Sequence, residues 1–184
     1  YKITYKLNKG KNNKTNPGTY TSEDEIKLKK PSRSGYHFAG WYADKKYKTK
    51  VTVIEKGSKG AVTLYAKWIK EISPSAKAAS LNSVKGTKVN TITASATVSN
   101  YVKSADSYYY LVLVDSNSGK VKKAVSKVKK PEKQNGKVTF QLDISGHPEY
   151  AQGKFAIGVK KSKSAYSLIS PKSYVSTPEK LSAN

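Results

Sequence analysis

Two alternating aromatic runs, residues 35–42 and residues 62–68, constrain the fold of this chain more than any other feature. Each run carries one tryptophan, and glycines bound the first run and lie in the basic link between the two. Side chains on a β-strand point alternately to opposite faces, so alternation over such short segments favours half-buried strands. A sheet this small has little else to bury, so we expect Trp41 and Trp68 to pack one of its faces. The alternative is an exposed stacking platform for a sugar ring or a partner.

Shorter patterns complete a first unit around these runs. Residues 2–7 alternate as a strand, and residues 8–18 form a polar loop of Asn, Lys, Gly and Pro. Ser22 precedes the acidic cluster of residues 23–25, which predicts the cap of a short helical turn. Residues 51–54 read either as a strand or as one helical turn.

Aromatic, glycine, proline and threonine positions recur through residues 1–69 in a recognisable order. They are Tyr1 to Asn8, Asn16, Pro17, Tyr20, Thr21, Pro31, Arg33, Gly35, Tyr36, Phe38, Gly40, Trp41, Tyr42, Gly57, Ser58 and Thr63 to Trp68. On these residues the segment resembles one bacterial family, the Listeria–Bacteroides repeat or internalin B-repeat. The resemblance implies a small β-grasp-like sheet with at most a short helix, and a binding and spacing module of a bacterial surface. The chain departs from the family at Lys9, where the first of two glycines usually stands.

A second unit follows a linker at residues 70–79, which is rich in Ser, Ala and Lys and contains Pro74. Residues 80–184 are rich in Ser, Thr and Val without a helical period. About seven short strands separated by turn signals are typical of a β-sandwich. We expect strands at residues 91–98, 107–114, 121–127, 137–144, 154–160 and 172–175, with a lead-in strand near residues 79–83.

The end of this unit resembles the last two strands of a fibronectin type III or immunoglobulin-like domain, within residues 80–178. Residues 154–160 and 170–178 carry that resemblance. The usual tryptophan of the second strand is absent, and tyrosines occupy that region instead. The fold class predicted for the whole chain is therefore mainly β, with a β-grasp-like domain followed by an immunoglobulin- or fibronectin-like sandwich.

The charge narrows the class of partner. The 184 residues include 35 Lys and Arg against 12 Asp and Glu, a formal net charge of +23. Residues 1–70 contribute +12 and residues 71–184 contribute +11, and Arg33 is the single arginine. Proteins that recognise particular nucleic-acid bases favour arginine, because its planar guanidinium group donates two hydrogen bonds side by side. Lysines instead give a diffuse electrostatic attraction that salt weakens. We therefore expect no sequence-specific nucleic acid. Either the lysines only keep the chain soluble, or they contact cell-wall or host polyanions and glycans.

Residues that could support catalysis or metal binding are few. The sequence has no cysteine, which excludes a thiol nucleophile and a zinc–cysteine site. His37 lies inside an alternating strand, and His147 lies in a turn beside Pro148. Nucleophilic catalysis needs a nucleophile, a base and an orienting group, and no such set is recognisable. We expect no enzyme activity, no cofactor and no metal, and no apolar run approaches the length of about 20 residues that spans a membrane.

The candidate contact residues are aromatic and basic. Residues 108–114 begin with three tyrosines, and alternation sends Tyr109, Leu111 and Leu113 to one face. One face should be core and the other a candidate exposed tyrosine patch, because tyrosine is favoured at contact surfaces. The candidates for partner or glycan contact are Tyr108, Tyr110, Tyr42, Arg33, Lys45 and Lys46.

Together these observations predict non-catalytic adhesion, spacing or attachment modules of a bacterial cell-surface or secreted protein, monomeric in isolation. A host surface protein is the partner that the family resemblance suggests, and polyanions are the partners that the charge suggests. The alternative is an accessory carbohydrate-binding module of an extracellular enzyme. Exposed coplanar Trp or Tyr rings would favour that alternative, and two buried tryptophans would count against it.

Overall fold

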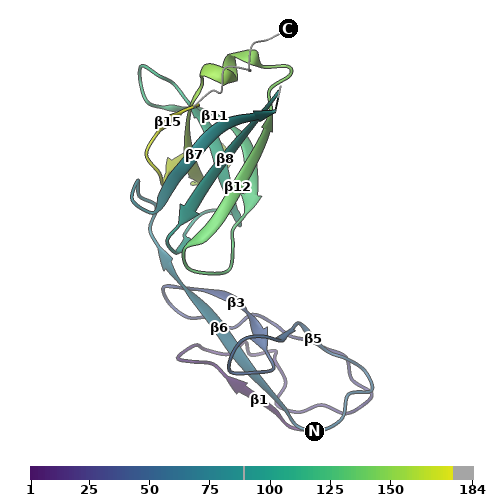
Figure 1. Cartoon of the computed structure of the whole chain (residues 1–184). Coiled ribbons are helices and arrows are strands. Elements are labelled where there is room, and N and C mark those ends of the chain that lie inside the picture. Colours follow the sequence, from purple (N-terminus) through teal and green to yellow (C-terminus); the bar gives the residue numbers. More distant parts are fainter. Residues whose placement is uncertain (89, 176–184) are drawn as a thin grey trace. The chain divides into compact units, whose positions relative to one another are not determined.

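The computed structural model describes residues 1–88 and 90–175 (Figure 1). Within these ranges the chain is built of β-strands and one short 3-10 helix, which confirms the mainly β prediction. It divides into two compact units, and the division falls between Lys70 and Glu71 in the sequence. Each unit has its own hydrophobic core.

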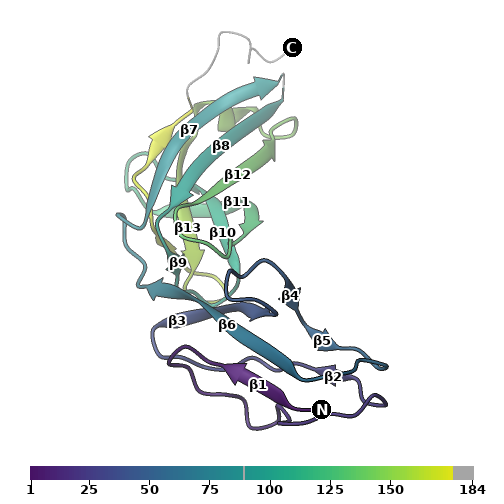
Figure 2. The ribbon, with the colours of Figure 1, turned by 60° about the horizontal axis from the view of Figure 1, so that its bottom comes forward.

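A mixed sheet in the order β1-β6-β3-β4 organises the first unit (Figure 2). The first strand pairs in parallel with the last, and β3 pairs antiparallel to that last strand. The first and last strands of this unit pair in parallel, and the other strands and loops lie between them in the sequence. This pairing fits the β-grasp-like expectation. The strands are β1 (Ile3–Lys6), β2 (Ile26–Lys27), β3 (Tyr36–Tyr42), β4 (Lys50–Val51), β5 (Val53–Ile54) and β6 (Val62–Ile72), and β2 pairs with β5 outside the main sheet.

Both tryptophans are structural, as the alternation predicted. Trp41 is 2% exposed, its ring lies 5.2 Å from that of Tyr5, and its Nε1 donates to the Lys29 carbonyl at 3.1 Å. Trp68 is half-buried against the same core, and its Nε1 donates to the Leu7 carbonyl at 2.8 Å. An indole N–H that leaves water needs such a partner. Each ring therefore ties a loop carbonyl to the core.

The loop after β1 explains why the departure at Lys9 is tolerated. Lys9 adopts a left-handed backbone conformation (φ 69°), which a lysine can adopt at a modest free-energy cost. The next residue is a glycine for another reason: a Cβ on Gly10 would lie 2.5 Å from Trp68 Cζ2. The turn therefore forms without the first glycine but needs the second.

Two local expectations in this unit are corrected or resolved. Residues 22–25 contain no helix, so the predicted cap at Ser22 is wrong; a turn runs from Thr21 to Asp24 instead. Asp24 closes the turn instead, since its carboxylate accepts from the backbone N–H and the hydroxyl of Thr21 at 2.7 and 2.9 Å. These hydrogen bonds from Thr21 lower the pKa of Asp24. Residues 51–54 are two short strands, β4 and β5, rather than a helical turn.

The second unit contains two main sheets, and the seven strands predicted for it are present. One sheet has the order β12-β8-β7, and the other has the order β11-β10-β13-β14 with β15 on β13. Three elements were not predicted: β9, β14 and the 3-10 helix η1 (Pro148–Gln152). The strands are β7 (Ala79–Lys88), β8 (Thr91–Val98), β9 (Tyr101–Val102), β10 (Tyr108–Val114), β11 (Val121–Lys129), β12 (Gly136–Asp143), β13 (Lys154–Lys160), β14 (Tyr166–Leu168) and β15 (Ser173–Tyr174).

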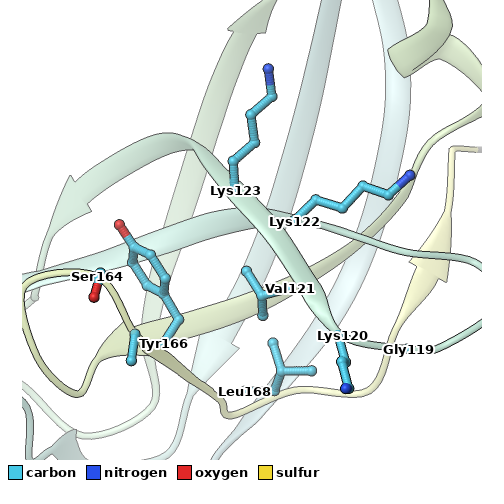
Figure 3. A pocket seen from close by; sticks show the side chains of 9 residues that line it. Gly119, Lys120, Val121, Lys122, Lys123, Ser164, Tyr166 and Leu168 are labelled. Carbon is cyan, nitrogen blue, oxygen red and sulfur yellow. The ribbon is translucent and has the colours of Figure 1, made fainter.

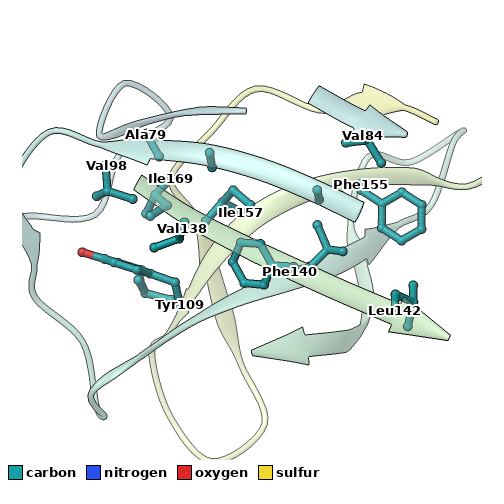
Figure 4. Close-up of a cluster of buried hydrophobic side chains, with 14 of the residues drawn as sticks. Ala79, Val84, Val98, Tyr109, Val138, Phe140, Leu142, Phe155, Ile157 and Ile169 are labelled. Atoms are coloured by element: carbon teal, nitrogen blue, oxygen red, sulfur yellow. The ribbon is translucent and has the colours of Figure 1, made fainter. Parts of the chain in front are cut away.

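The core of this unit lies between the two sheets (Figure 4). Strand β12 shows the strict alternation of a half-buried strand, with Val138, Phe140 and Leu142 inward. Phe140 and Ile157, which come from opposite sheets, both belong to this core (Figure 4). A sandwich core supplied by alternate residues of two sheets is the arrangement that the turn spacing predicted.

Most of the segment expected to link the units, residues 70–79, belongs to the second unit, which begins at Glu71. Strand β6 continues to Ile72, and its last two residues pair with β9, Glu71 with Tyr101 and Ile72 with Val102. Farther along the segment, Ala78 and Ala79 are buried in the second core. The residues of this segment that are exposed without interruption are 73–77.

A buried lysine fastens the loop between β9 and β10. Lys130 is 3% exposed, and its Nζ donates to the Val102 carbonyl at 2.7 Å, to the Asp106 carbonyl at 3.0 Å and to the Ser104 hydroxyl. The ammonium also lies 4.8 Å from the ring centre of Tyr101 and 5.3 Å from that of Tyr109. Burial lowers the pKa of Lys130 to about 8, while Asp106 and Glu71 act in the opposite direction. At pH 7 the group is thus still an ammonium ion with three acceptors, the number it can satisfy.

We predict that Trp41→Ala destabilises the first unit by about 3–5 kcal/mol, the usual loss for truncating a buried large side chain. Urea unfolding followed by circular dichroism measures this. Trp41→Phe, which keeps an aromatic ring but loses the indole N–H, should be less destabilising. An alanine variant as stable as the parent, but weaker in ligand binding, would show that Trp41 is a binding platform.

Limited proteolysis with elastase should cut first within residues 73–77, since exposed segments without regular structure are the preferred sites of nicking. Two protease-resistant pieces should remain, each with the circular dichroism of a β-protein. Early cleavage elsewhere in the chain, with this segment intact, would contradict the prediction.

The stability supplied by Lys130 should rise with pH between about 8 and 10.5, because the folded chain has then released a proton that the unfolded chain still holds. The test is the difference in unfolding free energy between the parent and Lys130→Met over that range. Tyr109, with its pKa raised to about 12, stays protonated throughout. A difference that falls, or stays flat, from pH 8 to 10.5 would contradict the assignment.

Candidate functional site

The outward face of the first sheet carries a row of tyrosines and lysines. Lys6 is in register with Tyr65, Tyr65 with Tyr42, and Tyr42 with Lys50, so the row crosses all four strands. Residues directly opposite one another in neighbouring strands share a face. The residues just before Tyr65 and Tyr42 in the chain, Leu64 and Trp41, are in the core. The row therefore lies on the other face.

Tyr47 and Lys67 extend this row into a shallow hollow. The Tyr47 ring packs edge-on against Tyr42 at 5.5 Å, and its hydroxyl accepts from Asn8 Nδ2 at 3.1 Å. Lys67 Nζ lies 5.4 Å and 5.7 Å from the ring centres of Tyr42 and Tyr47. The hollow has a volume of about 350 Å³ and is lined by Lys6, Asn8, Lys45, Tyr47 and Tyr65. We call the set of Lys6, Asn8, Tyr42, Lys45, Tyr47, Lys50, Tyr65 and Lys67 surface A.

The carboxylate beside surface A is already occupied by its own loop. Asp44 accepts backbone N–H groups of Lys46, Lys48 and Thr49 at 2.9–3.2 Å. These hydrogen bonds, that from Thr49 above all, lower the pKa of Asp44. Lys45 and Lys46 of this loop are exposed, and the Asp44 carboxylate accepts three backbone N–H groups of its own loop.

The predicted tyrosine patch of the second unit is only partly exposed. Tyr108 is 37% exposed, with Lys127 Nζ 4.8 Å from its ring centre. Tyr110 is 7% exposed, which corrects its prediction as an exposed contact residue. Its ring packs against Tyr166 at 5.1 Å, and its hydroxyl donates to Asp106 Oδ2 at 2.6 Å. Burial first, and the bond to Asp106 second, raise the pKa of Tyr110 well above its usual value.

Both faces of β10 are therefore packed. Tyr109 and Leu111 enter the core between the sheets, and Val112 and Val114 form a second apolar cluster with Ala156 on the outward face. A hollow of about 430 Å³ lies beside this cluster, where Val121, Tyr166 and Leu168 come together (Figure 3). The ammonium groups of Lys122 and Lys123 point away from Tyr166 (Figure 3), and Lys122 pairs with Asp115 at 3.3 Å. We call the outward face around Tyr108, Tyr110, Lys127, Lys160 and Tyr166 surface B.

The structure assigns the six candidate contact residues to three places. Tyr42 and Lys45 belong to surface A, with Lys46 on the same loop, but Tyr42 is 8% exposed and mainly supports Tyr47 and Lys67. Tyr108 and Tyr110 belong to surface B. Arg33 lies outside both, with its guanidinium carbon 3.6 Å from the ring centre of Tyr36. The residues that sequence reasoning missed are Lys6, Tyr47, Tyr65, Lys67 and Tyr166.

The two histidines have ordinary surroundings. His147 Nδ1 lies 3.1 Å from Glu149 Oε1, and its ring stacks on Tyr150 at 4.8 Å. His37 lies within β3, opposite Ile69. Residues 1–88 and 90–175 contain no group of three His, Asp or Glu side chains placed to hold a metal ion. In the same ranges no helix has the length and apolar character needed to cross a membrane.

Comparison with protein families places the first unit. Residues 1–67 match the model of the Listeria-Bacteroides repeat domain, which confirms the resemblance carried by the aromatic runs. Comparisons with curated proteins and with solved structures find no match to the chain. The repeat is found in extracellular proteins of bacterial surfaces. The matched residues end three positions before the boundary at Lys70, so the first unit corresponds to one copy of the Listeria-Bacteroides repeat domain.

Proposed function

We propose that this chain is a non-catalytic attachment and spacing segment of a bacterial surface or secreted protein, and that it holds anionic polymers of the cell wall or of a host surface. The observation that carries this proposal is the pairing of lysines with tyrosine rings on the outward faces of both units. The family match supports the location, and the charge of +23 supports the sign of the partner. An ammonium held over a ring face remains available to an anion from the solvent side.

The alternative, an accessory carbohydrate-binding module built on exposed flat rings, has less support. Trp41 is buried and Trp68 is half-buried with its N–H engaged, so neither offers a free face as a platform. The tyrosine pairs meet edge-on, at interplanar angles of 76° for Tyr42 and Tyr47 and 69° for Tyr110 and Tyr166. Such pairs present edges and hydroxyls rather than a coplanar stacking surface. In a bound ligand, the charged groups would thus contribute more to the binding free energy than the sugar rings.

The absence of catalysis is part of the same proposal. His37 and His147 belong to different units, and His147 has Glu149 and Tyr150 as its neighbours. A nucleophile with a base and an orienting group is not recognisable among the described side chains. We also propose that the chain acts as a monomer.

The chain should bind heparin–agarose at low salt and elute by a few tenths molar NaCl, because exposed charges lose their reach beyond a Debye length of about 10 Å at 0.1 M. Acetylation of the lysines should abolish retention, with circular dichroism as the control for folding. Duplex DNA of unrelated sequences should compete equally. Failure to bind at low salt, retention above about 1 M NaCl, or preference for one DNA sequence would contradict the proposal.

A further inference from the structure

We propose that surface A is a binding site for an acidic polysaccharide, a chain of sugar rings that bear carboxylate or sulfate groups. This inference rests on the proposed function and deepens it. The proposed function is a general attraction for anionic polymers, and the inference names one site and one class of ligand. Four features of surface A support it.

The first feature is the order of side chains across the sheet. Lys6, Tyr65, Tyr42 and Lys50 lie on four neighbouring strands. Strands are spaced about 4.8 Å apart, so the two lysines bracket a track of about 14 Å with aromatic residues between them. A chain with anionic groups at intervals and rings between them matches that order. Tyr65, which is more exposed than Tyr42, offers such a ring an apolar body and a hydroxyl at its tip.

The second feature is the backbone around the hollow. Four non-glycine residues among residues 1–88 and 90–175 have a positive φ, and three of them border surface A: Asn8 at 47°, Lys9 at 69° and Tyr47 at 55°. This conformation is rare for a residue as bulky as tyrosine and persists only where the surroundings enforce it, often at ligand sites. The contacts that hold the Tyr47 side chain are the edge of Tyr42 and the amide of Asn8. The left-handed backbone thus places a fixed tyrosine in the lining of the hollow.

The third feature is the charge of the site. Lys6 and Lys45 are exposed at the hollow, and Lys67 is held between two rings. Asp44 directs its carboxylate to the backbone N–H groups of its own loop. The site therefore offers ammonium groups that do not depend on Asp44, which suits a ligand carrying several negative charges.

The fourth feature is the neighbouring amide of Asn8. Its Nδ2 donates both to Tyr47 Oη and to the Ala66 carbonyl at 3.0 Å, which fixes the side chain at the lining of the hollow. The amide also carries an oxygen that can accept from a hydroxyl. Sugar hydroxyls can donate to such an acceptor, whereas a polyphosphate has no hydroxyl to offer. The combination of rings, an amide and lysines therefore favours an acidic sugar chain over a plain polyphosphate.

A charge-matched pair of variants of the full chain separates this site from the general field. Lys6→Gln with Lys45→Gln removes two charges at surface A, and Lys14→Gln with Lys59→Gln removes two from exposed loops of the same unit. With a heparin tetrasaccharide at 150 mM NaCl, the first pair should bind about tenfold more weakly than the parent and the second about twofold. Equal losses for the two pairs would overturn surface A as the site while leaving the proposed function intact.

Tyr65 tests the sugar component. Tyr65→Ser should weaken the tetrasaccharide about fivefold and leave inorganic polyphosphate unchanged, whereas Tyr65→Phe should keep the parent affinity within about twofold. Polygalacturonate oligomers, which carry carboxylates but no sulfate, distinguish a general acidic sugar from a sulfated one, and binding of either ligand supports the site. Amide shifts in NMR spectra of the full chain should be largest at Lys6, Tyr47 and Tyr65. Equal effects of Tyr65→Ser on both ligands, or shifts spread over both units, would overturn the proposal.

Discussion

The in-register parallel pairing of β1 with β6 decides which side chains of the first unit meet the core and which meet solvent. Ile3 and Tyr5 pair with Val62 and Leu64 on the core face. The alternate residues, Lys6 with Tyr65 among them, take the outward face. Because a shift of one residue would exchange the two faces, this register simultaneously creates the tryptophan core and surface A.

The two tryptophans stabilise that register through their hydrogen bonds as well as their size. Trp41 binds the carbonyl of Lys29, and Trp68 binds that of Leu7 at the end of β1. Gly10 gives Trp68 room against the same turn. The loops that frame the sheet are therefore tied to the core by the side chains that fill it. The second unit is fastened differently, with the ammonium of Lys130 binding the loop between β9 and β10.

Much of the fold could be predicted because it depends on local alternation. Strands β8 and β13 were expected at their exact residues. In β8, polar and apolar positions alternate, and β13 has turn residues at both ends. The short strands β9 and β14 were missed, because two or three residues carry no period and are strands only through their partners. The turn that Asp24 closes was mistaken for the start of a helix. A turn in which an Asp accepts from the backbone of Thr21 uses the same residue types as a helix cap.

The candidate site was harder to predict because it depends on register between distant segments. Tyr42 and Lys45 were identified, but Lys6 and Tyr65 join them only through pairing across about 60 residues of sequence. Tyr110 was expected outside because one face of a strand is often solvated, yet Tyr166 from β14 covers it. Surface A could have been predicted from two signals together. One is the alternation of residues 2–7 and 62–68, and the other is parallel pairing of the first and last strands.

Both tryptophans are structural, and they leave the outward face of the sheet to tyrosine and lysine. Hydrogen exchange of the two indole N–H groups, followed by NMR on the full chain, measures this. Both indoles should exchange far more slowly than free tryptophan, with Trp41, the more deeply buried, slower than Trp68. Exchange of either indole at the rate of free tryptophan would contradict it, because that N–H would then face water rather than the backbone carbonyl of Lys29 or Leu7.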